Sequence, residues 1–426
     1  MHTILTFVAK VDPARLEDLN RILAEVPEDV AGNSHVPFGE LTRVHFASLV
    51  VFPDDRYGPY LVFENNFDGP LDPYLDELIE RAGAGLDRIY RCCLGYQPSV
   101  PPSASKDRAS LRAYLRDHVV RPGAYHVGNV GRSAHQIRRE RRLRDTIELH
   151  LDGLVRDGRA TSREEVRREI QELVRADPSL GWAPDVRPRL TWLQKYGQYA
   201  VAAGALVALA ATWRVVVPLA IPALGLWAAV LRWKEARDAV WSGLADHAHV
   251  QRLRDEEDRP RVVQNHMANL SHVKPGLFRR YTLRAVLFAA NLLARRSTSG
   301  TLSGIPSIHF AHWSQIDGGK RLLFLSNYDG SWENYLDDFI DKASAGLTAI
   351  WGHTVEFPRV RWLIDGGSRD GPAFKEIARA RQVPTGVWYS AYPDLTVQQI
   401  DLDSTIREQL FARLDDDGLR AWLRSF

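Results

Sequence analysis

The stretch Tyr60–Leu86, YLVFENNFDGPLDPYLDELIERAGAGL, decides the fold because a second version of it occurs later in the chain. The second version is Arg321–Leu347, RLLFLSNYDGSWENYLDDFIDKASAGL. Upstream of each, residues 44–47 (VHFA) return as 308–311 (IHFA), and matching positions keep a nearly constant separation of about 261 to 264 residues. Several matches in the same order are difficult to explain except by duplication, so the sequence predicts two related halves.

Each half is expected to contain the same order of elements: strand, helix, strand, strand, helix and strand. In the first half the four strands are predicted at residues 4–9, 44–52, 60–65 and 124–130. The first helix begins at Pro13, a position where proline wastes no backbone hydrogen bond. The second helix carries apolar residues at helical spacing, namely Leu75, Leu78, Ile79, Ala82 and Leu86.

This order of elements is the ferredoxin-like pattern, and two such units commonly pack sheet against sheet. The arrangement resembles the dimeric α+β barrel superfamily, here fused into one chain. The sequence therefore predicts an α+β protein in which two ferredoxin-like repeats form a tandem barrel, with an apolar helical hairpin inserted between them. The expected segments are a first repeat, a charged helix with a linker, the apolar insert and a second repeat, at residues 1–155, 156–190, 191–240 and 241–426.

The insert is almost wholly apolar from Tyr199 to Leu231, interrupted by the charged residue Arg214. A bilayer span needs roughly 20 residues, so this run is too long for one span and slightly short for two. Pro218 and Pro222 lie near its middle, where a turn is expected. Basic residues flank both ends, as is typical of the cytoplasmic side of a membrane. We therefore predict a hairpin that anchors the protein at the cytoplasmic face of a membrane; the alternative is a hairpin buried in protein.

Membrane lipid is consequently the expected partner of the insert. The residues predicted to lie at the membrane are Trp192, Tyr196, Trp213, Arg214, Trp227 and Trp233. Residues 327–333 (NYDGSWE) and 387–393 (VWYSAYP) resemble a group of bacterial membrane-associated proteins with no settled function. That resemblance agrees with the predicted location.

The charge balance gives no reason to expect a nucleic-acid partner, because 55 Lys and Arg face 53 Asp and Glu for a formal net charge of +2. The two cysteines, Cys92 and Cys93, are adjacent, so the chain has neither a disulfide framework nor the ligand spacing of a zinc site. No metal site is expected from this pattern. The first residues also lack the basic and apolar regions of a secretory signal.

The repeated Asn-x-Asp-Gly motif, with Asn327 and Asp329 in the second half, occurs at a strand-to-helix turn. Asp can cap the helix that follows, which is the favoured interpretation, and ligand binding is the alternative. Aromatic residues are abundant in the second half, where they could line a pocket for an apolar small molecule such as a lipid derivative, or pack in the core. The residues predicted for ligand binding are Asn327, Asp329, Trp332, Trp388, Tyr389 and Tyr392.

Residues 367–371 (GSRDG) resemble the G-x-x-D-G motif of the dye-decolorising peroxidases. That resemblance implies that Asp370 and a distal arginine handle peroxide, while a histidine further downstream binds haem iron. No histidine follows His353, so this downstream ligand is missing. His309 has the counterpart His45, which argues for a structural role, whereas His312 and His353 have no such counterpart. The candidate catalytic residues are therefore His312, His353, Arg369 and Asp370, and haem is the candidate cofactor.

The leading hypothesis is a membrane-associated protein that binds or processes an apolar ligand through a tandem α+β barrel. The alternatives are a haem-dependent oxidoreductase of the peroxidase type and a non-catalytic scaffold or assembly module. Because no nucleotide-binding, serine-hydrolase or metalloprotease motif occurs, the sequence does not decide whether the protein is an enzyme.

Overall fold

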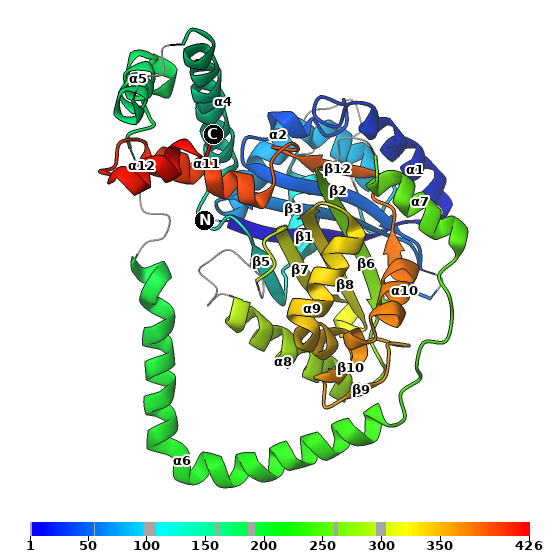
Figure 1. Ribbon diagram of the computed structural model, residues 1–426. Coiled ribbons are helices and arrows are strands. Elements are labelled where there is room, and N and C mark those ends of the chain that lie inside the picture. Colours follow the sequence, from blue (N-terminus) through cyan, green and yellow to red (C-terminus); the bar gives the residue numbers. More distant parts are fainter. Residues whose placement is uncertain are drawn as a thin grey trace.

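The computed structural model describes residues 2–54, 56–97, 108–158, 162–185, 192–259, 263–294 and 304–426. Two antiparallel sheets pack against each other, and helices surround them (Figure 1). The predicted α+β class is confirmed.

The first sheet has the strand order β12-β2-β3-β1-β4. Four of its strands come from the first half of the chain and one from the end of the second half. Their bounds are β1 (His2–Lys10), β2 (Val44–Phe52), β3 (Tyr60–Asp68), β4 (Val119–Val120) and β12 (Val387–Ser390).

The second sheet has the strand order β11-β6-β8-β7-β5, which is the order of the first sheet read from its opposite edge. Its bounds are β5 (Ala124–Val127), β6 (Gln264–His272), β7 (Ile308–Ile316), β8 (Arg321–Asp329) and β11 (Gln382–Val383). Strand β5 comes from the first half but pairs with β7, while β12 comes from the second half but pairs with β2. Each half therefore donates one strand to the sheet of the other, and the two halves are interlocked.

Helices cover the outer face of each sheet and bury its apolar side chains. The first core contains residues of α1 (Leu16–Glu25), α2 (Leu71–Tyr90) and α3 (Arg108–Asp117). The second core contains residues of α8 (Leu277–Ala294), α9 (Trp332–Trp351) and α10 (Gly371–Arg381), beside the short strands β9 (Val360–Arg361) and β10 (Asp365–Gly366). A separate apolar cluster joins α4 (Ala134–Arg156), α5 (Arg163–Ala176), α11 (Val397–Leu410) and α12 (Asp416–Leu423).

Apolar and polar layers alternate between the two sheets. One apolar layer includes Ile4, Phe46, Phe310 and Tyr392, and another includes Val50, Phe52, Val62, Ala268, Leu323 and Leu325. A third set of side chains, here called the polar belt, consists of Ser48, Glu64, Asn66, His266, His312 and Asn327. All of these side chains are buried, so the space between the sheets is a packed core.

The apolar insert is one helix, α6 (Trp192–Glu235), and not a hairpin. Pro218 and Pro222 lie inside this helix and do not form the predicted turn. An internal proline removes one backbone hydrogen bond and bends a helix without having to end it. Figure 1 shows α6 running as a bent rod outside the two sheets, before α7 (His247–Glu257).

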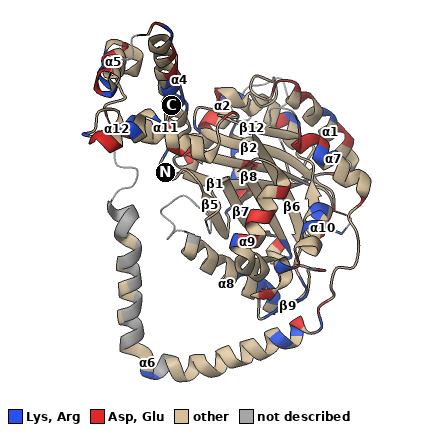
Figure 2. Ribbon diagram, viewed as in Figure 1, with Lys and Arg blue, Asp and Glu red and all other residues tan. Residues whose placement is uncertain are grey.

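No helix in the described part of the chain is both long and apolar enough to cross a membrane. The predicted membrane hairpin, and with it the anchoring at the cytoplasmic face of a membrane, is therefore wrong. The charged residues of the described part of α6 gather near its C-terminal end, apart from Arg214 (Figure 2).

The aromatic residues predicted to lie at the membrane have different surroundings. The Trp227 indole donates a hydrogen bond to Thr282 Oγ1 of α8 at 3.2 Å. Trp233 is exposed and lies under the guanidinium group of Arg237, 4.5 Å from the ring centroid. Trp213 is exposed and has the neighbouring Arg214 over its ring. The side chains of Trp192 and Tyr196 lie outside the described part of the structure.

Candidate functional site

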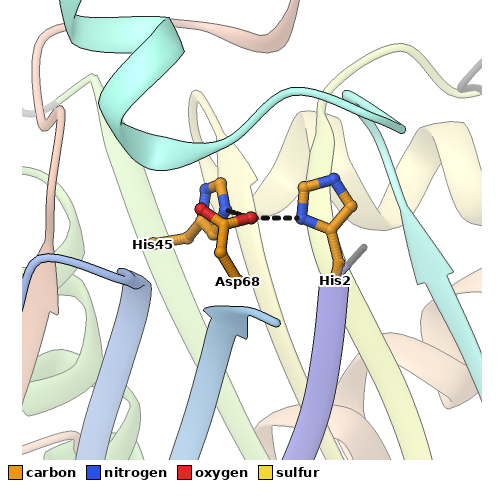
Figure 3. A group of neighbouring side chains, drawn as sticks. All are labelled: His2, His45 and Asp68. Atoms are coloured by element: carbon orange, nitrogen blue, oxygen red, sulfur yellow. Dashed lines mark ion pairs between the residues drawn. The ribbon is translucent and has the colours of Figure 1, made fainter. Parts of the chain in front are cut away.

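Three strands of the first sheet bring two histidines and one aspartate together at one end of the sheet interface. His2 begins β1 and lies opposite Asp68, the last residue of β3, in the antiparallel register. His45 lies on β2, where the register shifts between Val44 and Phe46. Such a β-bulge re-aims a side chain, and the His45 ring points toward Asp68 (Figure 3).

One carboxylate oxygen of Asp68 faces both imidazole rings. Its Oδ1 lies 3.1 Å from Nε2 of His45 and 3.4 Å from Nδ1 of His2 (Figure 3). The potential ligand atoms of these three residues, here called the triad, all lie within 4.8 Å of one another. Both nitrogens are buried, and neither makes a hydrogen bond of good geometry to a described residue. Two nitrogens and a carboxylate thus converge as the ligands of a transition metal do.

Backbone amides hold the triad from its outer side. The Ala134 N–H, at the start of α4, donates to Asp68 Oδ2 at 2.9 Å, and the Gly131 N–H donates to His2 Nε2 at 3.1 Å. Burial lowers the pKa of His2 to about 3; the charge of His45 adds to this effect and Asp68 opposes it. Burial alone would raise the pKa of Asp68, but His45 and the charge of His2 outweigh it and leave this pKa below its usual value.

Aromatic rings enclose His45. Its Nδ1 lies 2.8 Å from the hydroxyl oxygen of Tyr392, which belongs to the second half of the chain. The Phe310 ring packs against His45 with 5.3 Å between centroids, and Phe46 contacts both Phe310 and Tyr392. The His45 ring is therefore fixed in place by packing and by one hydrogen bond.

The second half has a counterpart of the triad in which glutamine replaces His2. His309 also lies at a bulge, and its Nε2 is 2.7 Å from Oδ1 of Asp329. The amide nitrogen of Gln264 lies 3.3 Å from the same Nε2 and donates to two backbone carbonyls. Asp329 Oδ2 accepts the Val397 N–H at 2.8 Å. The repeated aspartates therefore bind the starts of α11 and α4, and the prediction that they cap the helix that directly follows them is wrong.

The polar belt is centred on one of its own members, Glu64, whose carboxylate is completely buried. Its Oε1 accepts hydrogen bonds from Asn66 at 2.9 Å and from Asn327 at 3.1 Å. Its Oε2 lies 2.9 Å from Nε2 of His266 and accepts the Ser48 hydroxyl at 3.1 Å. Donors from both sheets therefore meet on this one side chain.

His312 lies beside this carboxylate without a hydrogen bond to any described residue. Its Nδ1 is 3.7 Å from Oε1 of Glu64. Burial lowers the pKa of His312 to about 4, against the opposing charge of Glu64. Burial would raise the pKa of Glu64, but the hydrogen bond and charge of His266, with the charge of His312, bring it to about 2.

The residues predicted for ligand binding do not form one site. Asn327 and Trp388 do meet, since the Trp388 indole donates to the Asn327 side-chain oxygen at 2.8 Å. Asp329 pairs with His309 in the counterpart of the triad, and Tyr392 contacts the triad itself. These residues lie near one another because the two halves are interlocked.

The two remaining aromatic residues of that set lie elsewhere. Tyr389 stacks on Phe38 in the first core, with 5.4 Å between ring centroids. Trp332 lies under the Arg379 guanidinium group, which is 3.7 Å from its ring centroid. Both are buried, so they pack in the cores.

The peroxidase-like motif forms a helix start. The Asp370 side chain accepts the Ala373 N–H at 3.3 Å and caps α10. Arg369 pairs with Asp365 at 2.9 Å on the exposed surface. Capping and a surface ion pair account for both residues.

The two histidines predicted as haem ligands lie in different surroundings. His312 belongs to the polar belt, whereas the ring of His353 lies near the charges of Lys274 and Arg279. Burial lowers the pKa of His353 to about 3, and those two charges add to the effect. Both rings are completely buried in close packing, so the residues around them do not fit a haem group.

An apolar pocket lies between β6, β8, α9 and α10. It is lined by residues that include Met267, Phe324, Tyr335, Phe339, Trp351 and Arg381. The cavity volume is about 20 Å³, which is room for roughly one water molecule. Binding of a lipid-sized ligand there would require the pocket to open, and the predicted apolar ligand stays a prediction.

The sequence reasoning missed His2 and Glu64. A comparison of the two halves could have found both, because His2 matches Gln264, and Glu64 matches Leu325. Glu64 also interrupts an apolar strand, which is an unusual position for a carboxylate. His45 has the counterpart His309 in the second half, and a histidine that both halves share favours a structural role.

Comparisons with protein-family models, with curated proteins and with solved structures found no match.

Proposed function

We propose that the triad of His2, His45 and Asp68 binds one divalent first-row transition metal, and that this ion is the centre of the protein's activity. The observation that carries the proposal is the convergence of two buried imidazole nitrogens and a carboxylate oxygen within 4.8 Å. Neither nitrogen makes a good hydrogen bond to a described residue.

Imidazole and carboxylate ligands suit zinc, iron and related ions. Three protein ligands leave at least one position for water or a substrate, which is how catalytic sites differ from closed structural ones. Such an ion could polarise a bound carbonyl or phosphoryl group or activate a water molecule. The reaction class that the arrangement supports is therefore metal-assisted chemistry at the open position.

Binding changes the state of His2. Its Nε2 accepts the Gly131 N–H, so the neutral ring carries its proton on Nδ1, the atom that faces Asp68. If His2 held a metal through Nδ1, the proton of its ring would have to lie on Nε2, and the hydrogen bond from Gly131 would be lost. The exchange of the Gly131 amide with solvent should accordingly speed up in the metal-bound protein.

The experiment is a titration of chelator-treated full-length protein with Co²⁺, Zn²⁺ and, without oxygen, Fe²⁺, followed by calorimetry and by the Co²⁺ absorption spectrum. We expect one ion per chain. His2→Gln, which copies the second half, should abolish binding. The matched control is His309→Gln, which changes the counterpart histidine and should leave one site. Equal binding by the wild type and His2→Gln, or no binding by the wild type, contradicts the proposal.

We also propose that each half is a ferredoxin-like unit and that the molecule is a tandem α+β barrel. The shared strand order of the two sheets and the packed layers between them support this assignment.

A further inference from the structure

Residues of the second half hold His45 by its backbone and by its side chain. Strand β12 pairs with β2, with Ser390 opposite Phe46. Directly after it, the Ala391 N–H donates to the carbonyl oxygen of His45 at 2.9 Å. The next residue, Tyr392, places its hydroxyl 2.8 Å from His45 Nδ1. The bulged histidine is therefore clamped at two points by adjacent residues of the other half.

The hydroxyl of Tyr392 suits a metal-bound His45. A metal on Nε2 requires the lone pair there, so the neutral ring must carry its proton on Nδ1. That N–H can then donate to the Tyr392 oxygen, which fixes the tautomer and the angle of the ring. Tyr392 is buried and packs edge-on against Phe46 and His45, so it has little freedom to move away.

The counterpart histidine lacks this arrangement. Nδ1 of His309 has no hydrogen-bond partner in the described part of the chain, and its Nε2 lies between Asp329 and the Gln264 amide. The first half thus differs from the second in two independent ways, in its third potential ligand and in the partner of its bulged histidine. Both differences favour metal binding at the triad of the first half over binding at its counterpart in the second half.

We infer that Tyr392 is a positioning residue of the metal site and that the site is complete only when both halves of the chain are assembled. This inference rests on the proposed metal binding, but it fails separately from it. It assigns the orienting partner of His45 to a strand end more than 300 residues away in the chain.

The test compares Tyr392→Phe with wild type, both full length, in the same Co²⁺ and Zn²⁺ titrations. Loss of the orienting partner of a histidine ligand typically weakens metal binding about 10- to 100-fold, and we expect that loss with the stoichiometry still at one. The Co²⁺ spectrum should shift as well, which a purely structural role of the hydroxyl would not cause.

Tyr328→Phe is the matched control. Tyr328 is completely buried and stacks on Tyr335 at 3.9 Å, and its hydroxyl has no partner in the described part of the structure. Its removal should leave metal affinity unchanged. Wild-type affinity in Tyr392→Phe overturns the inference and leaves the proposed function standing, whereas a wild type that binds no metal overturns both.

A measurement on the wild type keeps the inference testable if Tyr392→Phe does not fold. Nitrogen-15 NMR of the imidazole rings reports which nitrogen carries the proton. With Zn²⁺ bound, His45 should be protonated at Nδ1 and metal-bound at Nε2. A His45 bound to zinc through Nδ1 overturns the inference.

Discussion

The side-chain amide of Asn327 donates to Oε1 of Glu64 at 3.1 Å, across the interface between the two sheets. Asn66, which holds the same place in the first repeat, donates to the same oxygen at 2.9 Å. The two copies of one motif residue thus meet on a single carboxylate. Because Glu64 has a leucine counterpart, Leu325, this contact joins the halves without obeying their symmetry.

Replacing Glu64 should destabilise the protein strongly. Glu64→Ala leaves two asparagines and His266 buried without their acceptor, and removal of one member of a buried charged group usually costs about 3–5 kcal/mol. Urea unfolding should show this loss of free energy. The control, Glu80→Ala, changes an exposed residue of α2 and should stay within about 0.5 kcal/mol of wild type. If both variants were equally stable, the polar belt would not be what joins the two halves.

Acid should weaken the folded state in two stages. The pKa of His312 is about 4 in the folded protein, below the ordinary value of 6.5 for histidine, so the unfolded chain binds the proton first as the pH falls from 6.5 to 4. Stability is lost over that window, on the order of 3 kcal/mol. Glu64, with a folded pKa of about 2 against 4.5, contributes a further loss below pH 4.5.

Unfolding free energies at pH 7 and pH 4 measure the first stage. His312→Gln should reduce that difference by the share of the His312 ring, while His2 and His353, whose pKa values burial also lowers, keep contributing to it. His135→Gln, at an exposed position of α4, should keep the wild-type dependence. If the unfolding free energy of His312→Gln fell between pH 7 and pH 4 by as much as that of the wild type, His312 would not contribute to the acid sensitivity.

Asp68→Asn should separate metal binding from capping. Asparagine still offers an oxygen to the Ala134 N–H, so the start of α4 should lose little stability. The ligand charge is lost, and metal affinity should fall by about 100-fold or more. Asp329→Asn makes the same change beside Val397 and should leave the metal affinity as it was. A similar affinity loss in both variants would point to an indirect effect.

Glu235, the last residue of α6, should stabilise the turn at Trp362 and Leu363. Its buried carboxylate accepts the N–H groups of Trp362 and Leu363, each at 2.9 Å, and those two residues have φ of 58° and 59°. Non-glycine residues rarely adopt this conformation, so the two hydrogen bonds hold a strained turn. Glu235→Ala should cost about 1–3 kcal/mol and speed hydrogen exchange at the turn. Arg237→Ala, an exposed change on the same segment, should do neither.

The sequence predicted the long strands well because duplication and burial both mark them. The predicted strand 44–52 is β2 itself, and 60–65 lies inside β3. It could not predict which sheet receives β5 or β12, since strands of four residues carry too little pattern to specify a partner. Pro218 and Pro222 suggested a turn in α6, where the helix in fact continues.

The triad was harder to predict because its residues come from three separate strands, and no single stretch of sequence shows that they meet. His2 and Asp68 meet through strand register, and His45 joins them through a bulge. Tyr392 reaches His45 only because β12 crosses to the first sheet. Repeat comparison reveals which residues differ between the halves, but it does not show which of them come into contact.

The exchange of β5 and β12 has a consequence for synthesis of the chain. A ribosome that has released the first repeat exposes β2 with one edge unpaired, and the strand that covers this edge, β12, is made more than 300 residues after β2. Bare strand edges invite pairing with other chains. This edge of β2 therefore stays open until β12 has been made, and copies truncated before residue 387 should associate with one another through the unpaired edge.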